Sequence, residues 1–166
     1  DGHVVHVSSL AELETAVNNA SPGDSILVAD GYYELDGVYL LFDTPGVTLR
    51  SASGNREAVT LDGNSLTTEI IQIVASNVTI ADLTLREAYD HPIHVMSSGS
   101  SHTLNTLIYN VHIIDPGQQA IKINPVPGGF YADEGMIACS HIELTEAGRG
   151  RIRDHCYTGG VDAHQA

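Results

Sequence analysis

The chain has 166 residues, a length that suits one compact domain or one solenoid segment and is too short for two ordinary domains. Hydrophobic residues make up 42% and charged residues 17%, which gives enough apolar material for a core and argues against disorder. The net charge of -14 argues against nucleic acid as a partner, and no apolar run approaches the roughly 20 residues that a membrane helix needs, so we expect no membrane association.

The first predicted element is an amphipathic helix. Apolar residues recur at helical spacing from Leu10 to Ala20, and Ser9 with Glu12 has the spacing of a capping box. The residues Ser21-Pro22-Gly23-Asp24 then stop the helix. We expect residues 1–24 to form an N-terminal strand and a capping helix that covers the apolar end of the β-rich region.

From Ser25 onward the pattern changes to short β-rich runs that repeat, and no further helix of that quality is predicted. Repeats of about 22 to 31 residues with several short strands each are typical of a solenoid. One series consists of Val59-Thr60-Leu61, Leu83-Thr84-Leu85, Val111-His112-Ile113 and Ile142-Glu143-Leu144. A second consists of Ile71-Gln72-Ile73, Ile93-His94-Val95, Ile121-Lys122-Ile123 and Val161-Asp162-Ala163, and a third of Gly46-Val47-Thr48-Leu49 and Asn77-Val78-Thr79-Ile80.

A β-sandwich also contains many short strands, but it predicts hairpins with two-residue turns, whereas the loops between like runs are long here. The favoured fold is therefore all-β: a parallel β-helix over residues 25–166 with no obvious C-terminal cap. This single domain is either a whole solenoid or a fragment of a longer one.

Several segments carry a family resemblance. The residues from Pro22 to Tyr33, followed by those from Gly46 to Ser51, resemble the N-terminal portion of right-handed parallel β-helix proteins of the pectate-lyase-like superfamily. The segments 77–85, 117–124 and 156–165 look similar to coils of a less characterised branch. The nearest functional relatives that this implies are the chondroitinase B and alginate lyase group, whose known lyases are longer. Because the same architecture hosts lyases, hydrolases, epimerases and passive shafts, the resemblance implies a fold more than a reaction.

The second series predicts one chemically rich surface. If Ile121 and Ile123 face inward, Lys122 faces outward, because side chains alternate along a strand. The same surface then holds the catalytic candidates Lys122, His94, Asp162 and His164 and the substrate-binding candidates Gln72 and Asn124. Elimination from a uronate polymer needs a base and a cation that neutralises the carboxylate, and Lys122 or His94 suits the first role and Lys122 or a metal the second. The alternative is an ordinary polar face with Lys122 paired to Asp162.

Two further ladders accompany the first series. Carboxylates at Glu87, Asp115 and Glu146, two residues after their triplets, either share Ca²⁺ or form a solvated face. Asp82, Asn110 and His141 precede their triplets and are expected to satisfy turn backbone groups. In this alignment Thr84, His112 and Glu143 are ordinary outward residues.

Two functions are carried forward. The first is a calcium-assisted lyase acting on an acidic extracellular polysaccharide, although a net charge of -14 repels a polyanion unless divalent cations bridge the two. The second is a non-catalytic β-helix scaffold or binding fragment that forms homo-oligomers by end-to-end stacking of its uncapped end. We expect a secreted or extracellular protein whose signal is already absent at Asp1, with Cys139 and Cys156 either free or disulfide-bonded.

Overall fold

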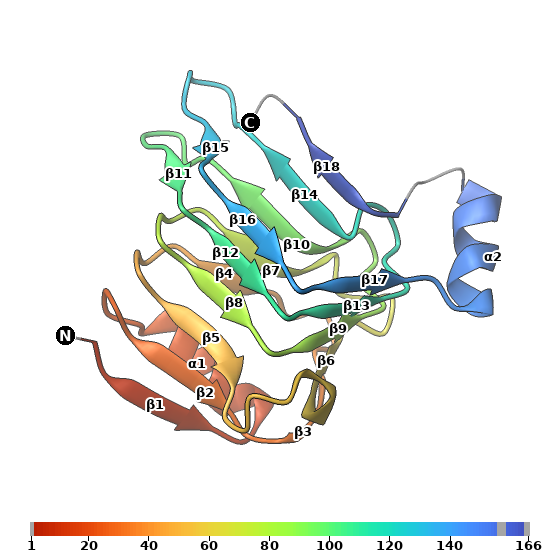
Figure 1. The fold of residues 1–166 in the computed structure, drawn as a ribbon, viewed down its shortest axis with the longest axis horizontal. Coiled ribbons are helices and arrows are strands. Elements are labelled where there is room, and N and C mark those ends of the chain that lie inside the picture. The colour runs from red at the N-terminus through yellow and green to blue at the C-terminus, as the bar shows by residue number, and fades with distance from the viewer. Residues whose placement is uncertain (1, 156–158, 165–166) are drawn as a thin grey trace.

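A computed structural model describes the backbone of residues 2–155 and 159–164, and the side chains of all of these except residues 153–155. The described chain is mostly β, and every strand pairing in it is parallel (Figure 1). No helix in these residues is long and apolar enough to cross a membrane.

Three stacked sheets account for nearly all strands. The first sheet contains, in spatial order, β1 (Val4–Val7), β2 (Ser25–Val28), β5 (Thr48–Ser51), β8 (Thr79–Ala81), β12 (Leu107–Tyr109) and β16 (Met136–Ala138). The second contains β3 (Gly31–Glu34), β6 (Val59–Asp62), β9 (Thr84–Arg86), β13 (His112–Ile114) and β17 (His141–Glu143). The third contains β4 (Leu40–Phe42), β7 (Glu69–Ile73), β10 (His91–Met96), β14 (Ile121–Asn124) and β18 (Val161–Ala163). A small extra sheet pairs β11 (Thr103–Leu104) with β15 (Ala132–Asp133).

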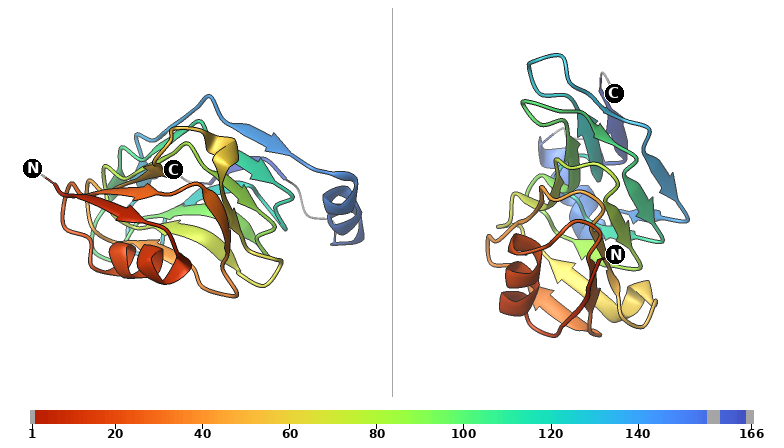
Figure 2. Two further views of the ribbon diagram at one scale, coloured as in Figure 1. Left: turned by 90° about the horizontal axis from the view of Figure 1, so that it is seen from below. Right: turned by 90° about the vertical axis from the view of Figure 1, so that its left-hand side faces the viewer.

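The chain visits the first, second and third sheets in turn, so that each circuit lies on the one before, an arrangement consistent with a parallel β-helix. Helix α1 (Leu10–Asn18) contacts β1, β2 and β4 at the start of the stack (Figure 2). Its first turn is capped as the sequence predicts, since the Ser9 hydroxyl accepts a hydrogen bond from the Glu12 amide. Leu13 and Val17 are the residues that it buries.

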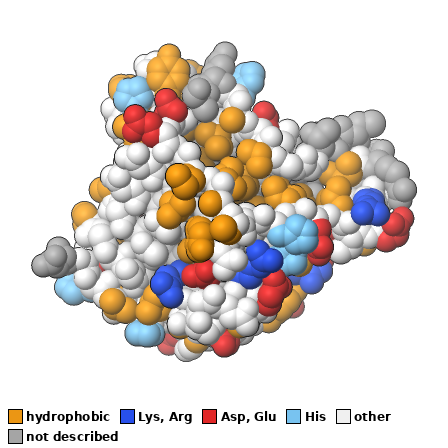
Figure 3. Space-filling model, viewed as in Figure 1, with side chains coloured by type: hydrophobic (Ala, Val, Ile, Leu, Met, Phe, Trp, Pro, Cys, Tyr) orange, Lys and Arg blue, Asp and Glu red, His pale blue; other side chains and the backbone are white. Residues whose placement is uncertain are grey.

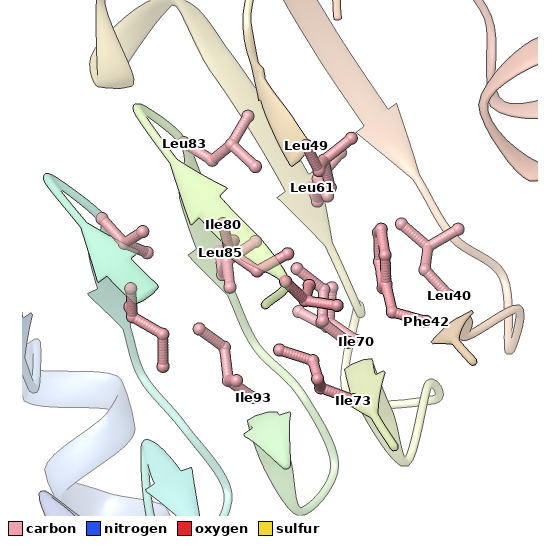
Figure 4. Close-up of a cluster of buried hydrophobic side chains, with 14 of the residues drawn as sticks. Leu40, Phe42, Leu49, Leu61, Ile70, Ile73, Ile80, Leu83, Leu85 and Ile93 are labelled. Carbon is pink, nitrogen blue, oxygen red and sulfur yellow. The ribbon is translucent and has the colours of Figure 1, made fainter. Parts of the chain in front are cut away.

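The interior is built from ladders of aliphatic side chains at matching positions of successive circuits. Leu49 lies opposite Ile80, and Leu61 lies opposite Leu85, all four fully buried. Figure 4 shows these side chains stacked within the core. Each such side chain contributes roughly 1.5–3 kcal/mol by leaving water, so the in-register stacking of the repeats is the main source of stability.

The predicted register is confirmed for the second and third series, but the last run of the first series is wrong by two residues. His112 lies opposite His141, so Glu143 lies opposite Ile114 instead of His112. The prediction aligned Ile142-Glu143-Leu144 with Val111-His112-Ile113 because both triplets alternate in the same way. A shift of two keeps inward and outward faces unchanged, and hydrophobic pattern alone does not detect it.

The corner between the first and second sheets is formed by residues with positive φ. Asp82 and Asn110 adopt φ values of 55° and 51°, and the Asn110 side-chain amide donates to the Asp82 carboxylate at 2.8 Å. Their equivalent in the next circuit is Cys139, with φ of 54°, and not His141 as the sequence predicts. Cys139 is exposed, while Cys156 falls outside the described residues.

Two short helices interrupt the strands after Ser25, contrary to expectation. A 3₁₀ turn, η1 (Arg56–Ala58), precedes β6, and α2 (Glu146–His155) follows β17 and stands away from the sheets in both Figure 1 and Figure 2. The sequence of α2 contains Gly148 and Gly150 and lacks an apolar stripe, so it gives no helical periodicity.

Candidate functional site

The third sheet presents the polar residues of the second series as one ladder. Gln72, His94, Lys122 and Asp162 occupy matching positions of β7, β10, β14 and β18. Two positions further along, Asn124 lies opposite Met96, and the His164 backbone amide donates to the Ile123 carbonyl at 2.8 Å. The structure therefore brings the predicted site residues to one face of one sheet. The chemical roles given to them stay predictions.

His94 is buried on this face and hydrogen-bonded through both of its ring nitrogens. Its Nδ1 lies 2.7 Å from a carboxylate oxygen of Glu69, and its Nε2 lies 2.6 Å from the amide oxygen of Asn124. The Asn124 amide nitrogen donates to the Pro125 carbonyl, which turns its oxygen toward the ring. Because both ring nitrogens face acceptors, this arrangement suits an imidazolium that donates on both sides. The side chain is only 9% exposed.

Glu69 anchors this arrangement and was not predicted. Burial acts to raise the pKa of its carboxyl, but the hydrogen bond and charge of His94, together with the hydrogen bond from the Gln72 amide, outweigh burial and hold the pKa below its usual 4.5. Glu69 therefore stays ionised beside His94. It begins β7, three residues before Gln72, and a spacing of three on a strand gives no signal that the two side chains meet.

His91 is a second unpredicted partner. Its ring lies edge-on to that of His94, with centroids 5.4 Å apart, and its Nδ1 is 3.2 Å from the Gln119 carbonyl oxygen. Burial lowers the pKa of His91, and the nearby charges of Lys122 and His94 lower it further, against opposing effects of the Gln119 carbonyl and Glu69. His91 is the first residue of β10.

Lys122 is half-buried beside these groups and is the one lysine of the chain. Although Asp162 lies directly opposite in the strand pairing, no ion pair joins the two within the described residues, so the Lys122–Asp162 pair of the alternative interpretation is not formed. Asp162 is half-buried and His164 is exposed. The side chain of Lys122 is thus available to a ligand on this face.

The predicted carboxylate ladder does not form one site. Glu87 pairs with Arg86, while both oxygens of Asp115 accept hydrogen bonds from Thr145, each at 2.6 Å. The register of β17 places Glu146 beyond the ladder, in the first turn of α2. These three residues therefore do not fit a shared calcium ion. The prediction that calcium assists the protein is left without residues that would bind it.

A different cluster lies on the second sheet, where the sequence assigned ordinary outward residues. His112, His141 and Glu143 each offer a ligand atom, and these atoms lie within 4.8 Å of one another. The misjudged register of β17 hid this group, because it separated His112 from His141. The spacing of His141 and Glu143, two residues apart on one strand, was the available signal.

Comparison with known proteins gives a fold likeness only. No family model matches the chain, and no curated protein matches it in sequence. Among solved structures, an alginate lyase from Paenibacillus sp. str. FPU-7 superposes with a TM-score of 0.55 at 17% sequence identity. The match covers 85% of this chain and 58% of that enzyme, so the chain spans little more than half of its length.

Proposed function

We propose that this chain is a secreted, carbohydrate-active, right-handed parallel β-helix protein whose third sheet carries a lyase site for an acidic polysaccharide. The observation that carries the proposal is the amine of Lys122, which has no ion-pair partner among the described residues and lies on the strand next to the buried, doubly hydrogen-bonded His94. The fold likeness to an alginate lyase supports the substrate class.

In the proposed β-elimination, Lys122 acts as base in its neutral amine form. Its Nζ takes the proton from the carbon beside the uronate carboxylate, and that electron pair forms the new double bond as the neighbouring carbon–oxygen bond breaks. A cation is needed to neutralise the carboxylate, so that the carbanion is tolerated, and calcium, which the sequence predicts to assist the reaction, would supply it. The leaving oxygen takes a proton from His164, and Asp162, which lies opposite Lys122 on the neighbouring strand, would stabilise the ammonium that forms on Lys122. Gln72 and Asn124 flank His94 as hydrogen-bonding positions for the sugar.

The test is ultraviolet absorbance of unsaturated uronate products from alginate, pectate and chondroitin, each with calcium and with chelator. Calcium is included because the sequence predicts that it assists the reaction. Lys122→Ala is expected to lower kcat by about 10²–10⁴-fold, the usual contribution of a general base. Lys122→Arg keeps the charge but cannot be deprotonated, so an equal loss identifies a base, and retained activity would identify a mere neutraliser.

Arg149→Ala is the matched control, because it removes one exposed positive charge from α2 and is expected to keep full activity. Thermal unfolding of each variant checks that the fold is intact. Absence of product from every polymer with the folded wild-type chain would contradict the lyase proposal.

A non-catalytic scaffold is the second candidate, favoured by apolar side chains left open on the last strands. Met136 and Val161 are 63% and 50% exposed, and Met136 lines an apolar depression together with Val95, Ile108 and Ile123. Figure 3 shows this apolar area between β16 and β14. A scaffold that stacks end to end predicts concentration-dependent oligomers in sedimentation, and these would dissociate on Met136→Asp substitution.

A further inference from the structure

The histidine pair on the second sheet is placed to offer two metal ligands close together. His112 on β13 lies directly opposite His141 on β17, and their rings stack with centroids 4.9 Å apart and planes 14° apart. Glu143 lies two residues beyond His141 and points to the same side of the strand. Figure 3 shows histidine side chains flanked by acidic side chains over this part of the fold.

The distances already approach those of a bound ion. The Nε2 atom of His112 and the Oε1 atom of Glu143 are 3.5 Å apart, and the ligand atoms of all three residues lie within 4.8 Å. Two ligands on a tetrahedral zinc with bonds of about 2.0–2.1 Å are roughly 3.4 Å apart. The His141 ring, which is exposed and stacks nearly parallel to that of His112, must turn so that the lone pairs of both rings converge on one ion.

The second nitrogen of His112 is held as in known metal sites. Its Nδ1 lies 3.2 Å from both carboxylate oxygens of Glu57, a residue of η1. A carboxylate on one imidazole nitrogen fixes the N–H there and leaves a lone pair on the other nitrogen. That other atom, Nε2, is buried and has no hydrogen-bond partner, which is costly unless something else fills the role.

We propose that His112, His141 and Glu143 bind a divalent transition-metal ion, with zinc as the reference ion, and that Glu57 positions His112 for it. Two imidazoles and one carboxylate suit zinc and leave a fourth position for water. The net charge of -14 raises the local concentration of any divalent cation. The ion links β13 to β17 and so clips two successive circuits together. This site is on a different sheet from Lys122 and does not depend on the lyase proposal.

The test is calorimetric titration of the chelator-treated full chain with Zn²⁺ alone. One ion per chain is expected, with a rise in Tm of roughly 5–10 °C at a free Zn²⁺ concentration about one hundred times Kd. His141→Ala and Glu143→Gln should each weaken binding at least about tenfold, since each removes one of three ligands. Both leave the buried core untouched, so neither is expected to unfold the chain.

Two further variants separate the ligands from other residues. His6→Ala removes an exposed histidine of β1 and should bind zinc like the wild type. Glu57→Gln should keep one ion per chain but weaken it by about 10–100-fold, as for a group that orients a ligand.

The competing explanation is a plain ion pair, in which a doubly protonated His112 bridges Glu57 and Glu143 without any metal. In that case no saturable one-to-one binding is seen, and the proposal is overturned. Binding that persists unchanged in both His141→Ala and Glu143→Gln would place the ion elsewhere and would overturn it equally.

Discussion

His94 illustrates how a strand position that points outward can still be buried. Its ladder neighbours are polar, yet Glu69 and Asn124 close over its ring on either side and leave its side chain 9% exposed. Alternation along a strand states only the face on which a side chain lies. Its exposure depends on how far the neighbouring side chains in the circuits above and below extend over it. For His94 these neighbours lie 25 and 30 residues away in the sequence.

The buried His91 should make stability sensitive to mild acid. Its pKa in the folded chain is lower than the usual 6.5, chiefly because it is buried. Below pH 6.5 the unfolded chain therefore binds a proton that the folded chain resists, so this contribution to stability is complete above pH 6.5 and is lost as the pH falls. We expect His91→Gln, which retains a donor for the Gln119 carbonyl, to flatten the fall in unfolding free energy between pH 6.5 and 5.

Chemical denaturation at several pH values measures this effect, and His6→Gln, at an exposed site, is the control. Carboxylates do not confuse the interpretation in this window. Folding lowers the pKa of four carboxyl groups, those of Glu12, Asp24, Glu57 and Glu69. Their contribution to stability is complete at a pH above their usual pKa values and is lost only as the pH falls below about 4.5. Parallel pH profiles for wild type and His91→Gln would contradict the assignment to His91.

At the scale of elements, the turns decide how closely successive circuits approach. A Cβ atom built at Gly117 would overlap the carbonyl oxygen of Tyr89, a backbone atom that cannot move aside cheaply. The Gly117 amide in turn donates to the Ala88 carbonyl at 3.1 Å. This close contact lies just before Gln119, whose carbonyl faces His91.

Gly117→Ala is therefore expected to destabilise the chain by about 1–3 kcal/mol, the usual cost of forcing extra volume into a packed position. Gly99→Ala is the matched control, because a Cβ there meets nothing within 4 Å, and its effect should stay within about 0.5 kcal/mol. Equal unfolding midpoints for the two variants would show that the turn relaxes freely.

The sequence predicts the repeat better than it predicts where the repeat is broken. The second series is correct in register because Ile-polar-Ile triplets recur with few alternatives, as at Ile93 and Ile121. The β17 strand is misplaced by two because Ile142 and Leu144 are interchangeable as inward residues. Helix α2 has no apolar stripe and follows a long-range contact, the hydrogen bond from Thr145 to Asp115. Contacts of this kind come from tertiary structure and leave no periodic trace.

At the scale of the whole molecule, the net charge opposes the proposed substrate. A polyanion is repelled at long range by a charge of -14, while Lys122 attracts it only at short range. Added salt weakens the long-range repulsion more than the short-range attraction, because the Debye length falls from about 30 Å at 0.01 M salt to about 8 Å at 0.15 M.

We therefore expect kcat/KM on the polymer to rise by at least about twofold over this range of salt. Initial rates on the polymer at low concentration measure it, and a short oligomer with few charges serves as the control and should respond less. A falling rate would mean that local attraction at Lys122 governs encounter, contrary to this expectation.

The stacked circuits also determine how the fold comes apart. Each described strand of the three sheets pairs only with the strand before and the strand after it in the stack, so no strand pairing among them ties the first circuit directly to the last. Cooperativity is then passed along a line of neighbours rather than shared through one common centre. A lesion in β14 weakens β10 and β18 first, while α1 and the opening circuit can stay folded, and local opening is graded by distance from the break.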